Sequence, residues 1–162
     1  MPIPSGIAFV LVPHLDPKRK SSMVELLERQ TSMPVVEATD GLLVEVDSVY
    51  LIPPIHFLSI SQGILRLSGL PDPIGVQTAI DYFLRSLAQD QQERSLGIVF
   101  SGTGSHGTLG IGEIKRCGGI AIVQSPKSSE FDQMPSSAIE TGLVDFVHTI
   151  DCHRENITET RP

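Results

Sequence analysis

The stretch Val99-Phe100-Ser101-Gly102-Thr103-Gly104-Ser105-His106-Gly107-Thr108-Leu109-Gly110 decides how this chain folds. Apolar residues 96–100 predict a short buried strand before the glycines, and residues 108–117 have helical spacing after them. As a pattern, Gly102-x-Gly104-x-x-Gly107 matches a dinucleotide-binding fingerprint, in which loop amides and a helix N-terminus hold phosphate. Beside Pro13-His14, the same loop instead looks like half of a damaged catalytic triad.

Strands and helices alternate on both sides of this stretch. Residues 7–12 form a continuous apolar run, as in a strand buried on both faces, and Ser21 or Ser22 can begin a helix that ends near Gln30. Residues 34–68 predict a β-rich excursion of short strands and hairpins, with a tight turn at 61–63. A helix at 76–91, a strand at 120–123, a short helix at 136–141 and a strand at 144–147 complete the pattern. We therefore predict an α/β fold, a doubly wound, mostly parallel sheet with a β-hairpin excursion.

Composition excludes several classes of function. The chain has 162 residues, which fits one domain at residues 1–150 followed by a polar tail at 151–162, and its net charge of −7 argues against nucleic-acid binding. Cys117 and Cys152 have no framework spacing, which favours a reducing cytoplasm. We find no signal peptide and no run of about 18 apolar residues, so we expect no membrane insertion. His148, Cys152 and His153 lack a second ligand pair, so we expect neither a metal nor a cofactor.

Two histidines follow predicted strands. His14 comes directly after strand 7–12 and His106 comes after strand 96–100. Because ligands bind beyond the carboxyl ends of parallel strands, neighbouring strands would bring both imidazoles to one edge. The alternative is that His14 is a turn residue and His106 a residue at the start of a helix.

The dinucleotide interpretation lacks its confirming residue. The fingerprint needs an acidic side chain after the next strand to hold the ribose, and the chain has Val123-Gln124-Ser125 there. A dinucleotide-binding domain remains only a distant alternative.

Five segments carry a family resemblance from about residue 5 to residue 146. They are Ala8-Phe9-Val10-Leu11-Val12-Pro13-His14-Leu15, Val49-Tyr50-Leu51-Ile52-Pro53-Pro54, Ile80-Asp81-Tyr82-Phe83-Leu84-Arg85-Ser86-Leu87-Ala88, Ser101-Gly102-Thr103-Gly104-Ser105-His106-Gly107 and Gln133-Met134-Pro135-Ser136-Ser137-Ala138-Ile139. Together they resemble the catalytic domain of the chemotaxis protein-glutamate methylesterase, CheB, most closely in its methylesterase–methyltransferase fusions. The resemblance implies a doubly wound fold, hydrolysis of glutamate methyl esters on chemoreceptors and, in some members, glutamine deamidation.

The resemblance also implies a site made of a serine nucleophile, a histidine base and an aspartate. His14 matches the base, Thr103 with Gly104 matches the loop beside the reacting carbonyl, and His106 stands where the family has its aspartate. The family's serine elbow lies upstream of the match at residues 9–15 and is not among these 162 residues. We therefore expect weak or absent esterase activity, with a non-catalytic interaction or regulatory module of chemotaxis-like signalling as the alternative. We expect Asp81 to be structural.

The family's first strand is absent together with its serine. Its absence predicts apolar surface or an unpaired edge around residues 7–12 or Val99. Because exposed edges pair with other chains, we expect a homodimer or higher assembly, or else a chain cut from a longer protein.

Overall fold

The computed structural model describes residues 4–13, 23–69 and 78–150. In chain order the elements are β1 (Phe9–Leu11), α1 (Met23–Glu28), β2 (Val35–Glu37), β3 (Leu42–Leu43), β4 (Val49–Leu51), β5 (Phe57–Ser61), β6 (Ile64–Ser68), α2 (Ala79–Gln91), η1 (Gln92–Arg94), β7 (Leu96–Val99), α3 (Thr108–Arg116), β8 (Ile120–Gln124), η2 (Pro126–Ser128), α4 (Gln133–Glu140) and β9 (Phe146–His148). His14, Ser21, Ser22 and the tail at 151–162 lie outside the described residues.

The strands form three small sheets. In the first sheet β4 lies between β1 and β2, and in the third β8 lies between β7 and β9; all four pairings are parallel. The middle sheet is antiparallel, with β6 between β3 and β5. Its hairpin turns at Gln62 and Gly63, which both have positive φ, as a tight two-residue turn requires. The predicted α/β fold with parallel strands and a β-hairpin excursion is confirmed.

The predicted extent of the β-rich excursion is wrong. We expected the strands near Val35 and Val49 to belong to it, but β4 pairs in parallel with both β1 and β2. Each of these strands has three residues, which is too short for hydrophobic periodicity to distinguish a parallel strand from a hairpin strand. The excursion proper comprises β3, β5 and β6.

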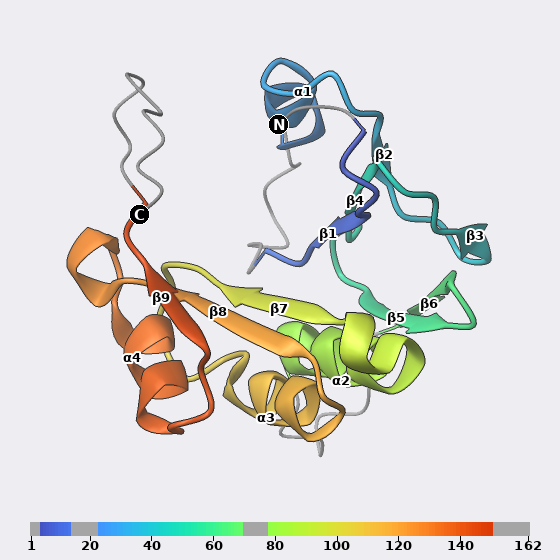
Figure 1. The fold of residues 1–162 in the computed structure, drawn as a ribbon. Coiled ribbons are helices and arrows are strands. Elements are labelled where there is room, and N and C mark those ends of the chain that lie inside the picture. The colour runs from blue at the N-terminus through green and yellow to red at the C-terminus, as the bar shows by residue number, and fades with distance from the viewer. Residues whose placement is uncertain (1–3, 14–22, 70–77, 151–162) are drawn as a thin grey trace.

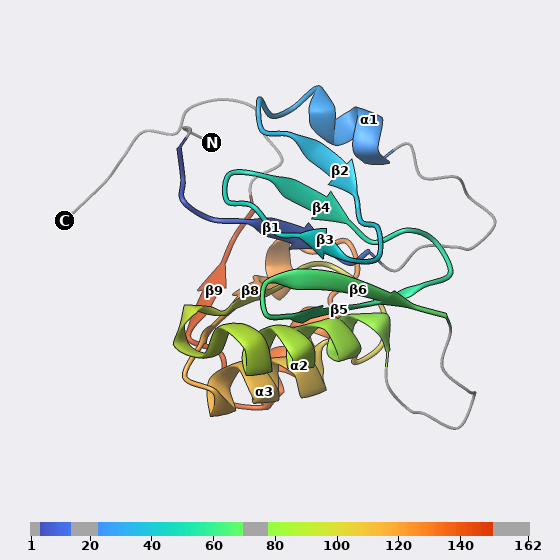
Figure 2. The same cartoon turned by 90° about the vertical axis from the view of Figure 1, so that its right-hand side faces the viewer.

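The first parallel sheet is covered on both faces. Phe9 and Leu11 pack with α1, through Val24 and Leu27. On the other face, a second cluster joins β1 and β4 to the β5–β6 hairpin and to α2; its members include Val10, Tyr50, Ile52, Leu58, Ile60, Leu65 and Phe83. Figure 2 shows this order of layers from α1 through the sheet and the hairpin to α2.

Within the described residues, helices cover one face of the third sheet. Val99, Ala121 and Val123 pack against α3 and α4, which Figure 1 shows beside this sheet. The alternate residues Leu96 and Ile98 are 38% and 40% exposed, so strand 96–100 is not buried on both faces as we expected. Among the described residues, these two side chains give apolar surface beside Val99, where the sequence predicts such a surface or an unpaired edge. None of the helices in the described residues is long and apolar enough to cross a membrane.

Candidate active site

The glycine-rich loop connects the end of β7 to the start of α3. Gly107 caps α3 with φ of 88°, and Gly104 has φ of 78°, a backbone region that disfavours residues with a Cβ. The sequence therefore folds locally as predicted, with a strand, a glycine turn and a helix. His106 is placed one residue before the helix cap.

His106 is half-buried and lies against its own loop. A Cβ atom built on Gly104 would lie 3.3 Å from the imidazole Cδ2 and 3.4 Å from Nε2. The position where the resemblance expects a carboxylate therefore holds an imidazole ring, which lies on the side of Gly104 where a side chain would project.

The loop is attached to the start of α4 by backbone hydrogen bonds. The Gly102 N–H donates to the Phe131 carbonyl at 2.9 Å, and the Met134 N–H donates to the Gly102 carbonyl at 3.0 Å. A Cβ on Gly102 would collide with the Met134 sulfur, so a larger residue there would force the Met134 side chain to move. Residues far apart in the sequence are thereby fixed side by side.

The Gly104 amide also has a partner. Its N–H donates to the side-chain Oε1 of Gln133 at 2.8 Å. Thr103 is exposed at the tip of the loop. The loop amide that we expected near a reacting carbonyl is therefore occupied by a glutamine in this structure, a contact that the sequence did not indicate.

A second glutamine holds the edge of the sheet. Gln124, at the end of β8, is buried; its Oε1 accepts from the Ser101 N–H at 2.8 Å and its Nε2 donates to the Ser128 carbonyl at 2.8 Å. It stands where the dinucleotide interpretation needs a carboxylate. Its signal in the sequence was its place directly after a buried strand.

Asp81 connects two helices behind the loop. Its side chain is 3% exposed and accepts from the Gly110 N–H in α3 at 2.9 Å and from the Thr78 hydroxyl at 2.6 Å. Thr78 in turn caps α2 by accepting from the Asp81 N–H at 3.1 Å. These bonds fit the structural role that we expected for Asp81.

The pairing of His14 with His106 stays a prediction. His14 lies outside the described residues, whereas Thr103, Gly104 and His106 share the loop after β7. No group of three or more metal-ligating side chains occurs within the described ranges.

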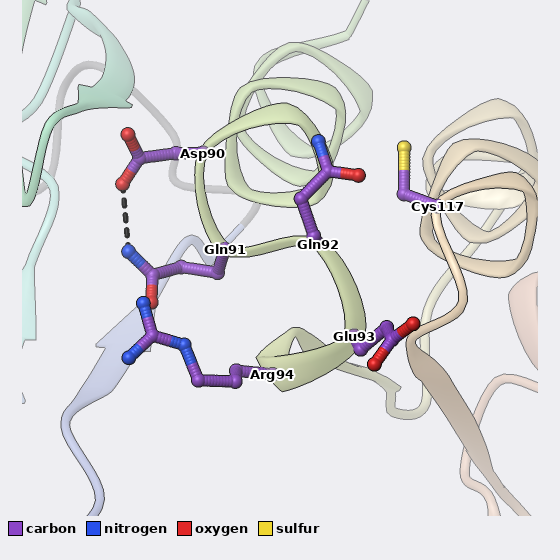
Figure 3. Close-up of a pocket in the computed structure, with 6 residues that line it drawn as sticks. All are labelled: Asp90, Gln91, Gln92, Glu93, Arg94 and Cys117. Atoms are coloured by element: carbon purple, nitrogen blue, oxygen red, sulfur yellow. Dashed lines mark hydrogen bonds between the residues drawn. The ribbon is translucent and has the colours of Figure 1, made fainter.

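A surface hollow lies at the other end of α3. It measures about 490 Å³ and is lined by Asp90, Gln91, Gln92, Glu93, Arg94 and Cys117. Figure 3 shows these side chains spread around an open space, with a hydrogen bond of 2.7 Å from Gln91 to Asp90. The glycine loop lies at the start of α3, whereas Cys117 in this hollow lies at the end of α3. The hollow is therefore not part of the candidate site.

Comparison with known proteins identifies the family. The CheB methylesterase family matches residues 1–157. An uncharacterized 104.1 kDa protein of Rhodobacter capsulatus is 42% identical over 123 residues, which are 76% of this chain and 13% of that protein. The protein-glutamate methylesterase/protein-glutamine glutaminase of Pyrococcus abyssi is 35% identical over 155 residues, which are 93% of this chain and 41% of that protein. The chain thus spans less than half the length of these curated relatives.

A solved structure agrees with this assignment. The CheB methylesterase catalytic domain of Thermotoga maritima superimposes with a TM-score of 0.78 and 28% sequence identity. The match covers 85% of this chain and 75% of that domain. The fold, the family match and the sequence relatives agree, and the chain belongs to the CheB methylesterase family.

Proposed function

We propose that this chain is a protein-glutamate methylesterase-like domain that meets methylated chemoreceptor segments and hydrolyses their esters weakly or not at all. The family and the names of the relatives support the kind of substrate: glutamate methyl esters, with receptor glutamines as a second group. Cysteines without framework spacing support a cytoplasmic location.

The observation that carries the proposed inactivity is the imidazole at position 106. In a triad, the carboxylate fixes the tautomer of the base and stabilises the imidazolium as it forms. A neutral His106 supplies no negative charge, and a protonated one would repel a developing cation on His14. Loss of the orienting carboxylate alone lowers turnover by about 10⁴ in a well-studied serine hydrolase. Among these 162 residues none matches the family's elbow serine, the group that would form an acyl-enzyme.

The loop geometry favours a second candidate, a non-catalytic receptor-binding module. An oxyanion needs amide donors that are not already engaged, and the Gly104 N–H donates to Gln133. A module of this kind would bind methylated receptor segments without turnover. Calorimetry with a methylated receptor fragment and the purified chain separates binding from hydrolysis.

The test is release of methanol from methylated receptor. We expect no turnover above background for the native sequence, and none for His106→Asp, because that change restores the carboxylate but not the nucleophile. His14→Ala is the control for contaminating esterases. Turnover in the native sequence that His14→Ala abolishes would contradict the proposed inactivity.

The distant dinucleotide alternative has less support. The Gly102 and Gly104 amides already donate within the chain, and Gln124 stands in the place of the ribose-binding acid. A thermal-shift measurement with a dinucleotide checks it, and we expect no stabilisation.

A further inference from the structure

One contact of the candidate site joins the glycine loop to a glutamine side chain. The Gly104 N–H donates to Gln133 Oε1 at 2.8 Å, and both residues are exposed. Oε1 is the carbonyl oxygen of a primary carboxamide. The loop amide therefore holds a carbonyl group at hydrogen-bond distance, which identifies the chemical class of group that fits there.

The group bound to the loop amide has the chemistry of the proposed substrates. A glutamate methyl ester and a receptor glutamine carry their side-chain carbonyl at the same number of bonds from the backbone as Gln133 does. The ester differs from glutamine only in the substituent on the carbonyl carbon, which is methoxy in place of NH₂. A backbone amide has one hydrogen to donate, so a receptor carbonyl and Gln133 exclude each other at Gly104.

The loop does not depend on this side chain for its attachment to α4. Backbone hydrogen bonds join Gly102 to Phe131 and to Met134. The Ser101 hydroxyl donates to the Phe131 carbonyl at 3.2 Å and accepts from the Phe131 N–H at 2.9 Å. The Gln133 side chain can therefore leave the loop amide while the loop keeps its place. Because the bond is exposed to water, breaking it costs little free energy.

We propose that Gln133 competes with the carbonyl of a receptor glutamine or glutamate ester for the Gly104 N–H. The inference rests on the proposed function and names a residue that determines the affinity of the site. An internal competitor lowers the apparent affinity in proportion to the fraction of molecules whose site is open. One exposed hydrogen bond limits this effect to about 2- to 10-fold.

Calorimetry with three synthetic receptor peptides tests the competition. The peptides carry a glutamate γ-methyl ester, a glutamine or an alanine at one position and are otherwise identical. Gln133→Ala should raise the affinity for the ester and glutamine peptides by about 2- to 10-fold. It should leave the affinity for the alanine peptide unchanged, because alanine has no side-chain carbonyl. The matched control is Gln89→Ala, at an exposed glutamine at the opposite end of α2 from Asp81, which should bind all three peptides as the native sequence does.

A second substitution at the same residue should act in the opposite direction. Gln133→Glu keeps the length of the side chain and replaces the carboxamide by a carboxylate, which accepts more strongly from an N–H. The affinity for the ester peptide should therefore fall below that of the native sequence. A residue that only braced the loop would weaken binding when truncated, so a gain with Gln133→Ala and a loss with Gln133→Glu separate competition from bracing.

The NMR signal of the Gly104 amide follows the competition directly. Hydrogen-bonded amide protons resonate downfield, so the Gly104 proton should move upfield in Gln133→Ala without peptide. The ester peptide should move it downfield again, and the alanine peptide should not. An unchanged Gly104 signal in Gln133→Ala overturns the inference.

The binding results separate this inference from the proposed function. If Gln133→Ala binds the ester peptide no more tightly than the native sequence does, or gains equally with the alanine peptide, competition is wrong and receptor binding stands. If neither the native sequence nor Gln133→Ala binds any of the peptides, the proposed function fails and this inference fails with it. Circular dichroism shows whether each variant is folded, and Gln133→Glu decides alone if Gln133→Ala is not.

Discussion

Asp81 links helix α2 to the helix that follows the glycine loop. Its carboxylate joins the cap of α2 to the first turn of α3, and α3 begins directly after the loop. A buried carboxylate is tolerated because hydrogen bonds replace its lost hydration. The sequence placed Asp81 on a helix but could not reveal its partner in α3, because that contact joins residues 29 positions apart.

Truncation of Asp81 should therefore be costly. Asp81→Ala leaves the Gly110 N–H buried without its acceptor and removes the link to Thr78, so we expect the free energy of unfolding to fall by about 2–4 kcal/mol. Asp81→Asn retains one acceptor oxygen and should cost less. Urea denaturation measures both, with exposed Glu130→Ala as the control, expected within about 0.5 kcal/mol of the native sequence. Equal stability of Asp81→Ala and Glu130→Ala would refute this role.

Helix α3 is the element that determines how closely two helices approach. A Cβ on Gly110 would lie 2.5 Å from Leu84 Cβ in α2, whereas a Cβ on Gly112 would meet nothing within 4 Å. Two glycines of one helix thus have opposite surroundings. Gly110 permits α2 and α3 to pack closely, whereas Gly112 makes no close contact and only lowers the stability of the helix.

The two alanine substitutions should change stability in opposite directions. Gly110→Ala forces α2 and α3 apart and should destabilise the fold by about 1–3 kcal/mol. Gly112→Ala should stabilise it by about 0.5–1 kcal/mol, because alanine favours the helix. Thermal melts followed by circular dichroism compare the two variants directly. The same sign for both would show that the packing of α2 on α3 does not control stability.

At the scale of helices and strands, the sequence predicted most of the elements but few of the contacts between them. The strand, turn and helix around Gly107 and the hairpin turn at Gly63 were recognisable because glycine and periodicity are local signals. The parallel pairing of β2 with β4 was not, since three-residue strands carry too little pattern. In the candidate site, His106, Thr103 and Gly104 were placed on one loop correctly, while Gln133 and Gln124 were missed as its partners. A glutamine that accepts a hydrogen bond from a distant segment produces no periodic pattern in the sequence, so these contacts could not be predicted.

At the scale of the whole molecule, Asp47 and Asp145 are among the carboxylates that connect segments distant in the sequence. The Ser5 hydroxyl donates to Asp47 at 2.8 Å, and this side-chain hydrogen bond, with backbone donors of Ser5 and Gly6, lowers the pKa of Asp47. The Ala121 N–H donates to Asp145 at 2.8 Å and, together with the Lys115 ammonium, lowers the pKa of that carboxyl. Asp145 thereby joins β8 and α3 to the start of β9.

These shifts predict loss of stability in acid. A pKa that is lower in the folded state than the ordinary 3.8 contributes stability above pH 3.8, and the contribution disappears as the pH falls through the folded pKa. Asp145→Asn should therefore have a lower urea midpoint than the native sequence at pH 6, and the difference should shrink below pH 4. Glu130→Gln is the control. A difference that is constant from pH 6 to pH 2 would contradict the assignment.

Hydrogen bonds between the glycine loop and the start of α4 couple the conformation of the loop to that of the helix. Any ligand that recruits the Gly104 amide must first displace Gln133, the opening residue of α4. Occupancy at the tip of the loop would thus remove a hydrogen bond that holds the first residue of α4. Amide hydrogen exchange in α4 would register such binding, even where no product is formed.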